Sequence, residues 1–171
     1  MAANKTIAII TAGGGEVVAI ANALVQQNYR LLLVLKDSTT SAKILTLVGG
    51  GAPHADLEII ECVKDGCWEA DMIFIDIPDD AVKEVVEMIK EVATQKIVFS
   101  MSGYKSKIDG KGSLRNLLPH SKVVRAINPP GLLGTFIEGD DQEAVQTIYN
   151  ILKTAGYHPT IASQVPEIKT S

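Results

Sequence analysis

The chain has 171 residues, of which 46% are hydrophobic and 21% charged, and its formal net charge is −4. This length suits one domain with a sizeable core, and the composition excludes a disordered chain. A mildly acidic chain lacks the excess of positive charge with which proteins bind nucleic acid or an anionic membrane surface. We therefore expect one soluble domain over residues 1–171, with small molecules rather than nucleic acid or membrane as its partners.

The apolar runs and the cysteines bear on the cellular compartment of the protein. The first run, Ile7–Ile10, is too short for a signal peptide or a membrane span, and no later run approaches the necessary length. Cys62 and Cys67 alone make neither a disulfide framework nor a zinc site, so we expect two reduced thiols in or near the core. These features favour a cytoplasmic protein.

The first half of the chain alternates apolar runs of strand length with helical patterns. Glu16–Gln26 is apolar on nearly all sides, as in a buried helix, and Ser41–Val48 predicts a short helix that Gly49–Gly51 ends. The predicted strands are Thr6–Ile10, Arg30–Leu35 and Leu57–Ile60. Strands that are apolar throughout, rather than alternating, indicate a parallel sheet covered on both faces.

The second half continues the same pattern. Asp71–Ile77 predicts a buried strand that Pro78 ends, and Asp79 is expected to cap a helix with one apolar face. Further strands are predicted at Lys96–Phe99, Lys122–Ile127, Thr135–Glu138 and Thr160–Ala162, with helices near Leu114–Leu118 and over Gln142–Ala155, ended by Gly156. The sequence therefore predicts an α/β fold with a doubly wound, mostly parallel sheet of about eight strands, of the NAD(P)-binding Rossmann type. Its ligand crevice would lie at the carboxyl ends of the strands.

A glycine-rich loop follows the first predicted strand and precedes the first predicted helix. The loop consists of Thr11, Ala12, Gly13, Gly14 and Gly15. A dinucleotide fingerprint has glycines at three positions here, for a tight turn, for close approach of the pyrophosphate and for helix packing. Counted from the strand end, these positions hold Thr11, Gly13 and Glu16, so one glycine survives; a shifted register keeps Gly13 and Gly15 but needs a longer strand. The loop is either a dinucleotide site or a turn without a ligand.

Two acidic residues near this loop depart from an ordinary dinucleotide site. Glu16 would lie in the first helical turn, where its carboxylate satisfies the helix dipole and repels a diphosphate. Asp76 would lie near the carboxyl end of a buried strand, where it faces the crevice, bonds a loop amide or titrates high. It is either a functional acid or a locally hydrogen-bonded carboxyl group. Together they predict weak dinucleotide binding, of order 100 μM or worse, or none.

The end of the second predicted strand bears on the choice of cofactor. An acidic residue here would bind the ribose hydroxyls of NAD, whereas a basic residue suits the 2′-phosphate of NADP. The chain has Lys36 followed by Asp37, Ser38 and Thr39. Lys36 with the two hydroxyls favours NADP, although Asp37 weakens the case and a solvated loop is the alternative.

Three stretches together resemble one family. They are Asp71–Val86 (DMIFIDIPDDAVKEVV), Leu117–Gly131 (LLPHSKVVRAINPPG) and Gly139–Pro159 (GDDQEAVQTIYNILKTAGYHP). The chain resembles the NADP oxidoreductases that depend on the deazaflavin coenzyme F-420, with their related dinucleotide-binding proteins, from Thr6 to about Ser163. The first stretch is shared with many reductases, whereas the second and third are more specific.

The resemblance implies a role for each part of the crevice. It implies that the loop Thr11–Gly15 holds the pyrophosphate, and that Lys36, Ser38 and Thr39 hold the 2′-phosphate. It implies further that Ile77 and Pro78 flank the cofactor and that Ser100, Met101, Ser102 and Asn128 line its nicotinamide end. Thr11, Glu16 and Asp76 stand where the family usually has glycine, glycine and a small residue. The chain also ends where family members continue into a C-terminal helical segment.

Two functions remain open from the sequence. One is an NADP(H)-binding oxidoreductase that transfers hydride to an unidentified acceptor such as a deazaflavin or flavin, in which no protein residue can be named as catalytic. The other is a non-catalytic binding or interaction module that has lost dinucleotide affinity. The apolar run Pro129–Leu133 and the absent closing segment predict a homodimer.

Overall fold

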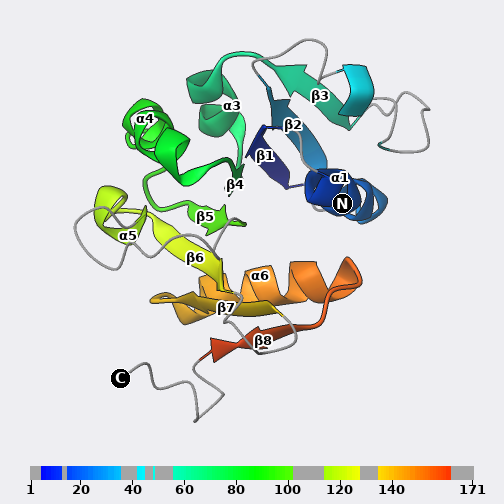
Figure 1. The fold of residues 1–171 in the computed structure, drawn as a ribbon, viewed down its shortest axis with the longest axis vertical. Coiled ribbons are helices and arrows are strands. Elements are labelled where there is room, and N and C mark those ends of the chain that lie inside the picture. The colour runs from blue at the N-terminus through cyan, green and yellow to red at the C-terminus, as the bar shows by residue number, and fades with distance from the viewer. Residues whose placement is uncertain are drawn as a thin grey trace.

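An eight-stranded sheet organises the protein (Figure 1). The computed structural model describes residues 5–12, 15–35, 42–44, 48, 56–101, 114–127 and 135–162. The strand order is β3-β2-β1-β4-β5-β6-β7-β8, and every pair is parallel except β6 with β7. The strands are β1 Thr6–Thr11, β2 Arg30–Val34, β3 Leu57–Ile60, β4 Met72–Asp76, β5 Ile97–Ser100, β6 Lys122–Ile127, β7 Thr135–Gly139 and β8 Pro159–Ile161. The predicted doubly wound, mostly parallel fold is confirmed.

Helices cover both faces of this sheet. They are α1 Gly15–Gln26, α3 Val63–Glu69, α4 Asp79–Ile89, α5 Leu114–Leu117 and α6 Gln142–Thr154. Figure 1 shows α3, α4 and α5 on one side of the sheet and α1 and α6 on the other. Because successive strand residues face opposite sides, Ile7 and Ile9 of β1 pack in the core under α1 and α6, whereas Ala8 and Ile10 pack under α3 and α4. The apolar strands are therefore buried on both faces, as their composition predicts.

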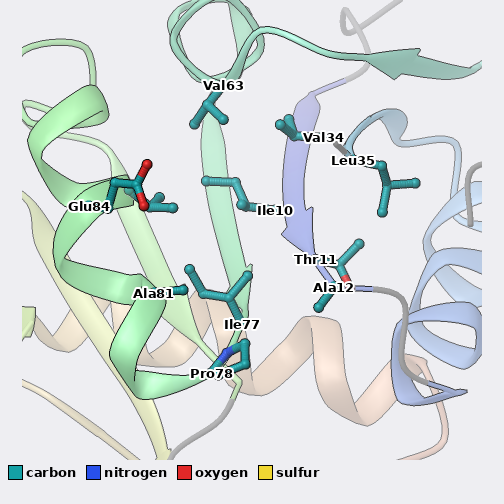
Figure 2. A pocket seen from close by; sticks show the side chains of 11 residues that line it. Ile10, Thr11, Ala12, Val34, Leu35, Val63, Ile77, Pro78, Ala81 and Glu84 are labelled. Carbon is teal, nitrogen blue, oxygen red and sulfur yellow. The ribbon is translucent and has the colours of Figure 1, made fainter. Parts of the chain in front are cut away.

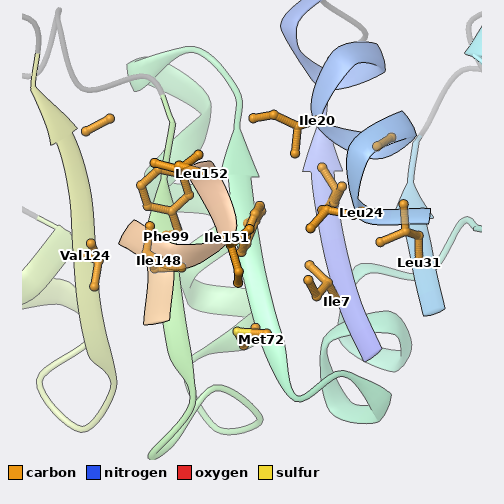
Figure 3. Packing of buried hydrophobic residues seen from close by; sticks show 14 of the residues in the cluster. Ile7, Ile20, Leu24, Leu31, Met72, Phe99, Val124, Ile148, Ile151 and Leu152 are labelled. Atoms are coloured by element: carbon orange, nitrogen blue, oxygen red, sulfur yellow. The ribbon is translucent and has the colours of Figure 1, made fainter. Parts of the chain in front are cut away.

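The core under α1 and α6 is the larger of the two (Figure 3). Phe74 of β4 and Phe99 of β5 meet edge to face there, with ring centroids 5.2 Å apart and planes at 72°. Such a pair adds about 0.5–1.5 kcal/mol beyond the area it buries. This contact packs the middle of β4 against β5.

Helix α3 was not predicted from the sequence. It has Gly66 in its middle, which disfavours an isolated helix, and it is only seven residues long. A Cβ atom at Gly66 would lie 3.1 Å from a Val34 methyl group, so the glycine lets the helix pack closely on β2. Packing of Val63 and Cys67 into the core under α3 and α4 thus outweighs the poor helix propensity. The prediction for the thiols is confirmed for buried Cys67, whereas Cys62 is exposed; both are free.

The ends of two helices test the predicted caps. Asp79 was expected to cap α4, but the helix begins at Asp79 and Pro78 occupies the N-cap position. The backbone at Pro78 is held at φ −59° with an extended ψ of 148°, which suits that position without a side-chain acceptor. Gly156 follows α6 at φ +94°, which confirms the glycine predicted to end that helix.

Candidate functional site

A pocket of about 230 Å³ lies at the carboxyl ends of β1, β2 and β4, beside α3 and α4 (Figure 2). Its lining is Ile10, Thr11, Ala12, Val34, Leu35, Val63, Ile77, Pro78, Ala81, Glu84 and Val85. The order of the strands reverses between β1 and β4. Ligands of open α/β sheets bind outside the carboxyl ends of the strands at such a reversal. The pocket therefore lies where the fold predicts a binding site.

The pocket brings together four of the predicted site residues. Thr11 and Ala12 reach it from the end of β1, and Ile77 and Pro78 from the turn after β4. Gly15 is the first residue of α1. Lys36, Ser38, Thr39, Gly13, Gly14, Ser102 and Asn128, and the apolar run Pro129–Leu133, lie outside the described residues.

Sequence reasoning missed the lining from β2, α3 and α4. Ala81, Glu84 and Val85 occupy one face of α4, at the three-and-four spacing that also predicts core packing. Figure 2 shows Ala81 and Glu84 on one side of the pocket and Leu35 on the other. Val63 belongs to the helix that was not predicted. For Ala81, Glu84 and Val85, the spacing along α4 was the only signal in the sequence, and the same spacing is expected of residues that line a pocket and of residues that pack in the core.

Thr11 and Asp76 form a pair on the other face of the same edge. They are register partners on β1 and β4, and Thr11 Oγ1 lies 3.3 Å from Asp76 Oδ2. By strand alternation their side chains face the same way as Ile9 and Phe74, toward the face that α1 covers. The Ala12 amide donates to the Asp76 carbonyl at 3.2 Å, which ties the start of the loop to β4. A carboxyl group is thereby fixed beside the residue that leads into the glycine loop.

The environment of this carboxyl group is unusual for an aspartate. Burial raises the pKa of Asp76 above its ordinary value, and the hydrogen bond from Thr11 opposes that shift. Asp76 is half-buried, so water still reaches the carboxyl group. Of the alternatives left open by the sequence, the structure shows local hydrogen bonding, from the Thr11 hydroxyl rather than from a loop amide.

The predicted nicotinamide end is described in part. Ser100 ends β5, and the Met101 amide donates to the Ile75 carbonyl at 2.9 Å, which anchors the chain as it leaves the sheet. Both side chains are half-buried. Glu16 is the second residue of α1, so its predicted position in the first helical turn is confirmed.

A second pocket, of about 320 Å³, lies at the opposite edge of the sheet. Its lining is Arg115, Leu118, Pro119, Ser121, Lys122, Val123, Asp140 and Asp141. The charges are paired with one another: Arg115 Nε lies 3.1 Å from an Asp140 carboxylate oxygen, and Lys122 Nζ lies 4.0 Å from one of Asp141. Asp141 also caps α6 by accepting from the Ala144 amide at 2.8 Å. These contacts link α5 and the start of β6 to the turn between β7 and α6.

The described ranges hold neither a cluster of metal ligands nor a membrane-spanning helix. Within them, no group of three or more His, Cys, Asp or Glu side chains is arranged to hold a metal ion. No helix among the same residues is long and apolar enough to cross a membrane.

Comparisons with known proteins point to one group of folds. No protein-family model and no curated protein sequence matches the chain. Among solved structures, a pyrroline-5-carboxylate reductase from Coxiella burnetii has a TM-score of 0.69 and 17% identity, over 94% of this chain and 60% of that one. An imine reductase variant from Myxococcus stipitatus in complex with NAD⁺ has a TM-score of 0.68 and 12% identity, over 90% and 53%. A protein described as an F420-dependent NADP reductase from Arthrobacter sp. FB24 has a TM-score of 0.68 and 15% identity, over 91% and 82%.

The chain thus spans little more than half the length of the first two of these reductases. Identities below 20% over nine-tenths of the chain support a shared fold rather than a shared activity. Combined with the strand order, they establish that this protein has the Rossmann-type α/β fold of NAD(P)-binding reductases.

Proposed function

We propose that the protein binds NADP(H) at the carboxyl edge of β1, β2 and β4 and serves hydride transfer to a small-molecule acceptor. The observation that carries this proposal is the pocket at the reversal of strand order, lined by four residues that sequence reasoning assigned to the cofactor. The fold shared with reductases, one of them in complex with NAD⁺, supports it.

The adenosine half of a dinucleotide fits the described residues. In this fold the residue after the second strand meets the adenosine ribose, so the ring lies near the end of that strand. Val34 and Leu35 line the pocket there, and Ala81 and Val85 of α4 face them across it. An apolar pocket with few polar groups is what a planar ring requires.

The diphosphate fits less well. In this fold it would bind at the amino end of α1, which begins at Gly15, where free amides point outward. Asp76 is held on the face of the sheet that α1 covers, and Glu16 is the second residue of that helix. Two acidic residues at this end of α1 oppose a diphosphate, so we propose weak binding, of order 100 μM or worse.

The chemistry follows from this arrangement. NADPH, when bound, supplies a hydride that reduces the acceptor while a proton comes from water, and NADP⁺ is left. The chain's part is to bind the adenosine half and to position the nicotinamide near Ser100 and Met101. We leave the acceptor at the level of a deazaflavin, a flavin or another small hydride acceptor, and we propose that a homodimer roofs the crevice.

The test is a calorimetric titration of the full chain with NADP and with NAD. We expect tighter binding of NADP, and we expect Lys36→Ala to remove the preference. Glu16→Gly should strengthen NADP binding by at least tenfold, and Glu16→Gln should recover part of that gain. Equal affinities for the two cofactors, or a preference for NAD, would overturn the assignment of NADP.

A second function is favoured by one observation, the carboxyl group that Thr11 and β4 hold beside the expected diphosphate site. This carboxyl group would not impair a binding module that keeps the pocket but no longer binds a dinucleotide for hydride transfer. If Glu16→Gly gives no measurable NADP binding, this non-catalytic function replaces the first.

A further inference from the structure

The carboxyl-edge pocket is mostly apolar, with one carboxylate, in its described lining. Of its described lining residues, only Thr11 and Glu84 have polar side chains, and none is a lysine, arginine or histidine. Asp76, hydrogen-bonded to Thr11, adds a second carboxyl group at the same edge. The described lining therefore offers apolar surface with the Glu84 carboxylate, and the Asp76 carboxyl group lies on the other face of the same edge, an arrangement that suits an uncharged ligand better than an anionic one.

The size of the pocket limits what it can hold. Pockets for drug-sized ligands usually have volumes of roughly 300–1,000 Å³. At about 230 Å³ this pocket suits one planar ring system with its attached sugar, rather than a whole dinucleotide. The end of β2, where this fold places the adenosine ribose, forms one wall through Val34 and Leu35.

The two faces of the sheet at this edge would contact different parts of a nucleotide. The pocket side chains Ile10, Val34 and Val85 belong to the core on the α3 and α4 face. Thr11 and Asp76 alternate to the α1 face, where a 5′-phosphate would turn toward the amino end of that helix. A ligand that ends at the 5′-hydroxyl would occupy only the apolar face, whereas a 5′-phosphate directed toward the amino end of α1 would also approach the Asp76 carboxyl group.

We propose that the pocket between β1, β2 and α4 binds an uncharged purine-nucleoside-type ligand more tightly than the 5′-phosphorylated forms of the same nucleoside. This inference rests on the proposed nucleotide site, and it reverses the usual preference of that site for phosphates. Apolar contact with the pocket supplies the affinity, and repulsion by Asp76 penalises the 5′-phosphate.

The experiment is a set of calorimetric titrations of the full chain at pH 7.5 with adenosine and with 5′-AMP. We expect adenosine to bind about tenfold more tightly. Asp76→Asn should lower the ratio at least twofold by strengthening the binding of 5′-AMP, with the affinity for adenosine unchanged within twofold. Asp140→Asn, which removes the same charge at the opposite edge of the sheet, should leave the ratio as it is in the unaltered chain.

Salt gives a second measurement that needs no variant. Because the penalty arises from repulsion between like charges, the ratio should shrink as NaCl is raised from 50 to 500 mM, with adenosine little affected. If 5′-AMP binds as tightly as adenosine or more tightly, the inference is wrong while the proposed nucleotide site stands. If neither ligand binds at millimolar concentration, both are wrong.

Discussion

Two pockets in the described part of the protein lie at opposite edges of one sheet, and they differ in the contacts that their side chains make. At the edge near α5 and the start of α6, Arg115 and Lys122 are paired with Asp140 and Asp141. At the carboxyl edge of β1, β2 and β4, apolar side chains face open space. In the charged pocket the side chains already bind one another. In the carboxyl-edge pocket, at the reversal of strand order, the apolar surface is free to contact a ligand. The volume alone would have favoured the charged pocket.

The largest effect is expected from filling the carboxyl-edge pocket. Ala81 lies on the face of α4 that lines it, so Ala81→Trp would place an indole ring in the space assigned to the ligand. We expect binding of adenosine and NADPH to fall at least a hundredfold, about 2.8 kcal/mol, in calorimetric titrations.

Asp140→Asn in the charged pocket is the control, and it should bind adenosine as the unaltered chain does. Circular dichroism should show that both variants fold. An Ala81→Trp variant that is folded and binds normally would exclude the carboxyl-edge pocket as the site.

A smaller effect is expected from Gly139 of β7, beside the charged pocket. A Cβ atom here would lie 2.7 Å from the Val123 carbonyl oxygen, so Gly139→Ala forces the backbone of β6 or β7 to move. We expect a loss of about 1–3 kcal/mol in the free energy of unfolding, or a decrease in Tm of at least about 2 °C, in thermal unfolding.

Gly66→Ala is the matched control, since its added methyl group meets a Val34 side-chain methyl at 3.1 Å, which can give way. Alanine also favours the helix, so this variant should lose less stability than Gly139→Ala. Equal losses of stability in the two variants would show that Gly139 is not more tightly packed than Gly66.

The smallest effect concerns Asp76 and pH. Burial raises the pKa of Asp76, so the folded chain keeps the proton at pH values where the unfolded chain has lost it. Stability therefore falls as pH rises through the interval between the ordinary aspartate pKa of about 3.9 and the raised value. Asparagine does not titrate, so Asp76→Asn should increase Tm at pH 7.5, on the order of 2 °C, and by less at pH 4.

Asp71, just before β4, provides the comparison for this variant. Its carboxylate accepts the Thr6 amide at 2.8 Å, and asparagine keeps an acceptor there. Asp71→Asn should give no increase in Tm at pH 7.5. An equal gain for Asp76→Asn at both pH values would contradict the account of a destabilised carboxylate.

Most of the fold was predictable because a continuous run of apolar residues indicates a strand that is buried on both faces. Runs such as Leu31–Val34 and Met72–Ile75 are apolar throughout, as expected for strands of a sheet covered on both faces. Helix α3 was missed because it forms through contact with β2 and β3 at Gly66, and not through its own propensity.

The site was predictable only where it lies next to strand ends. Thr11, Ala12 and Pro78 follow predicted strands, Ile77 is the last residue of one, and all four line the pocket. The contact between Thr11 and Asp76 depends on the register of β1 against β4, over a separation of 65 residues. The wall formed by Ala81 and Val85 could not be told from core, because both require the same helical spacing.

The central claim is that a nucleotide binds at the carboxyl edge and not in the charged pocket. The most direct test is to titrate isotope-labelled protein with NADPH and to follow the backbone amide signals by two-dimensional NMR, which detects weak binding. We expect the largest shifts at Ala12, Leu35 and Ala81, with Arg115 and Asp141 unchanged. Shifts confined to Arg115, Ser121 and Asp141, or no shifts at millimolar NADPH, would contradict the account.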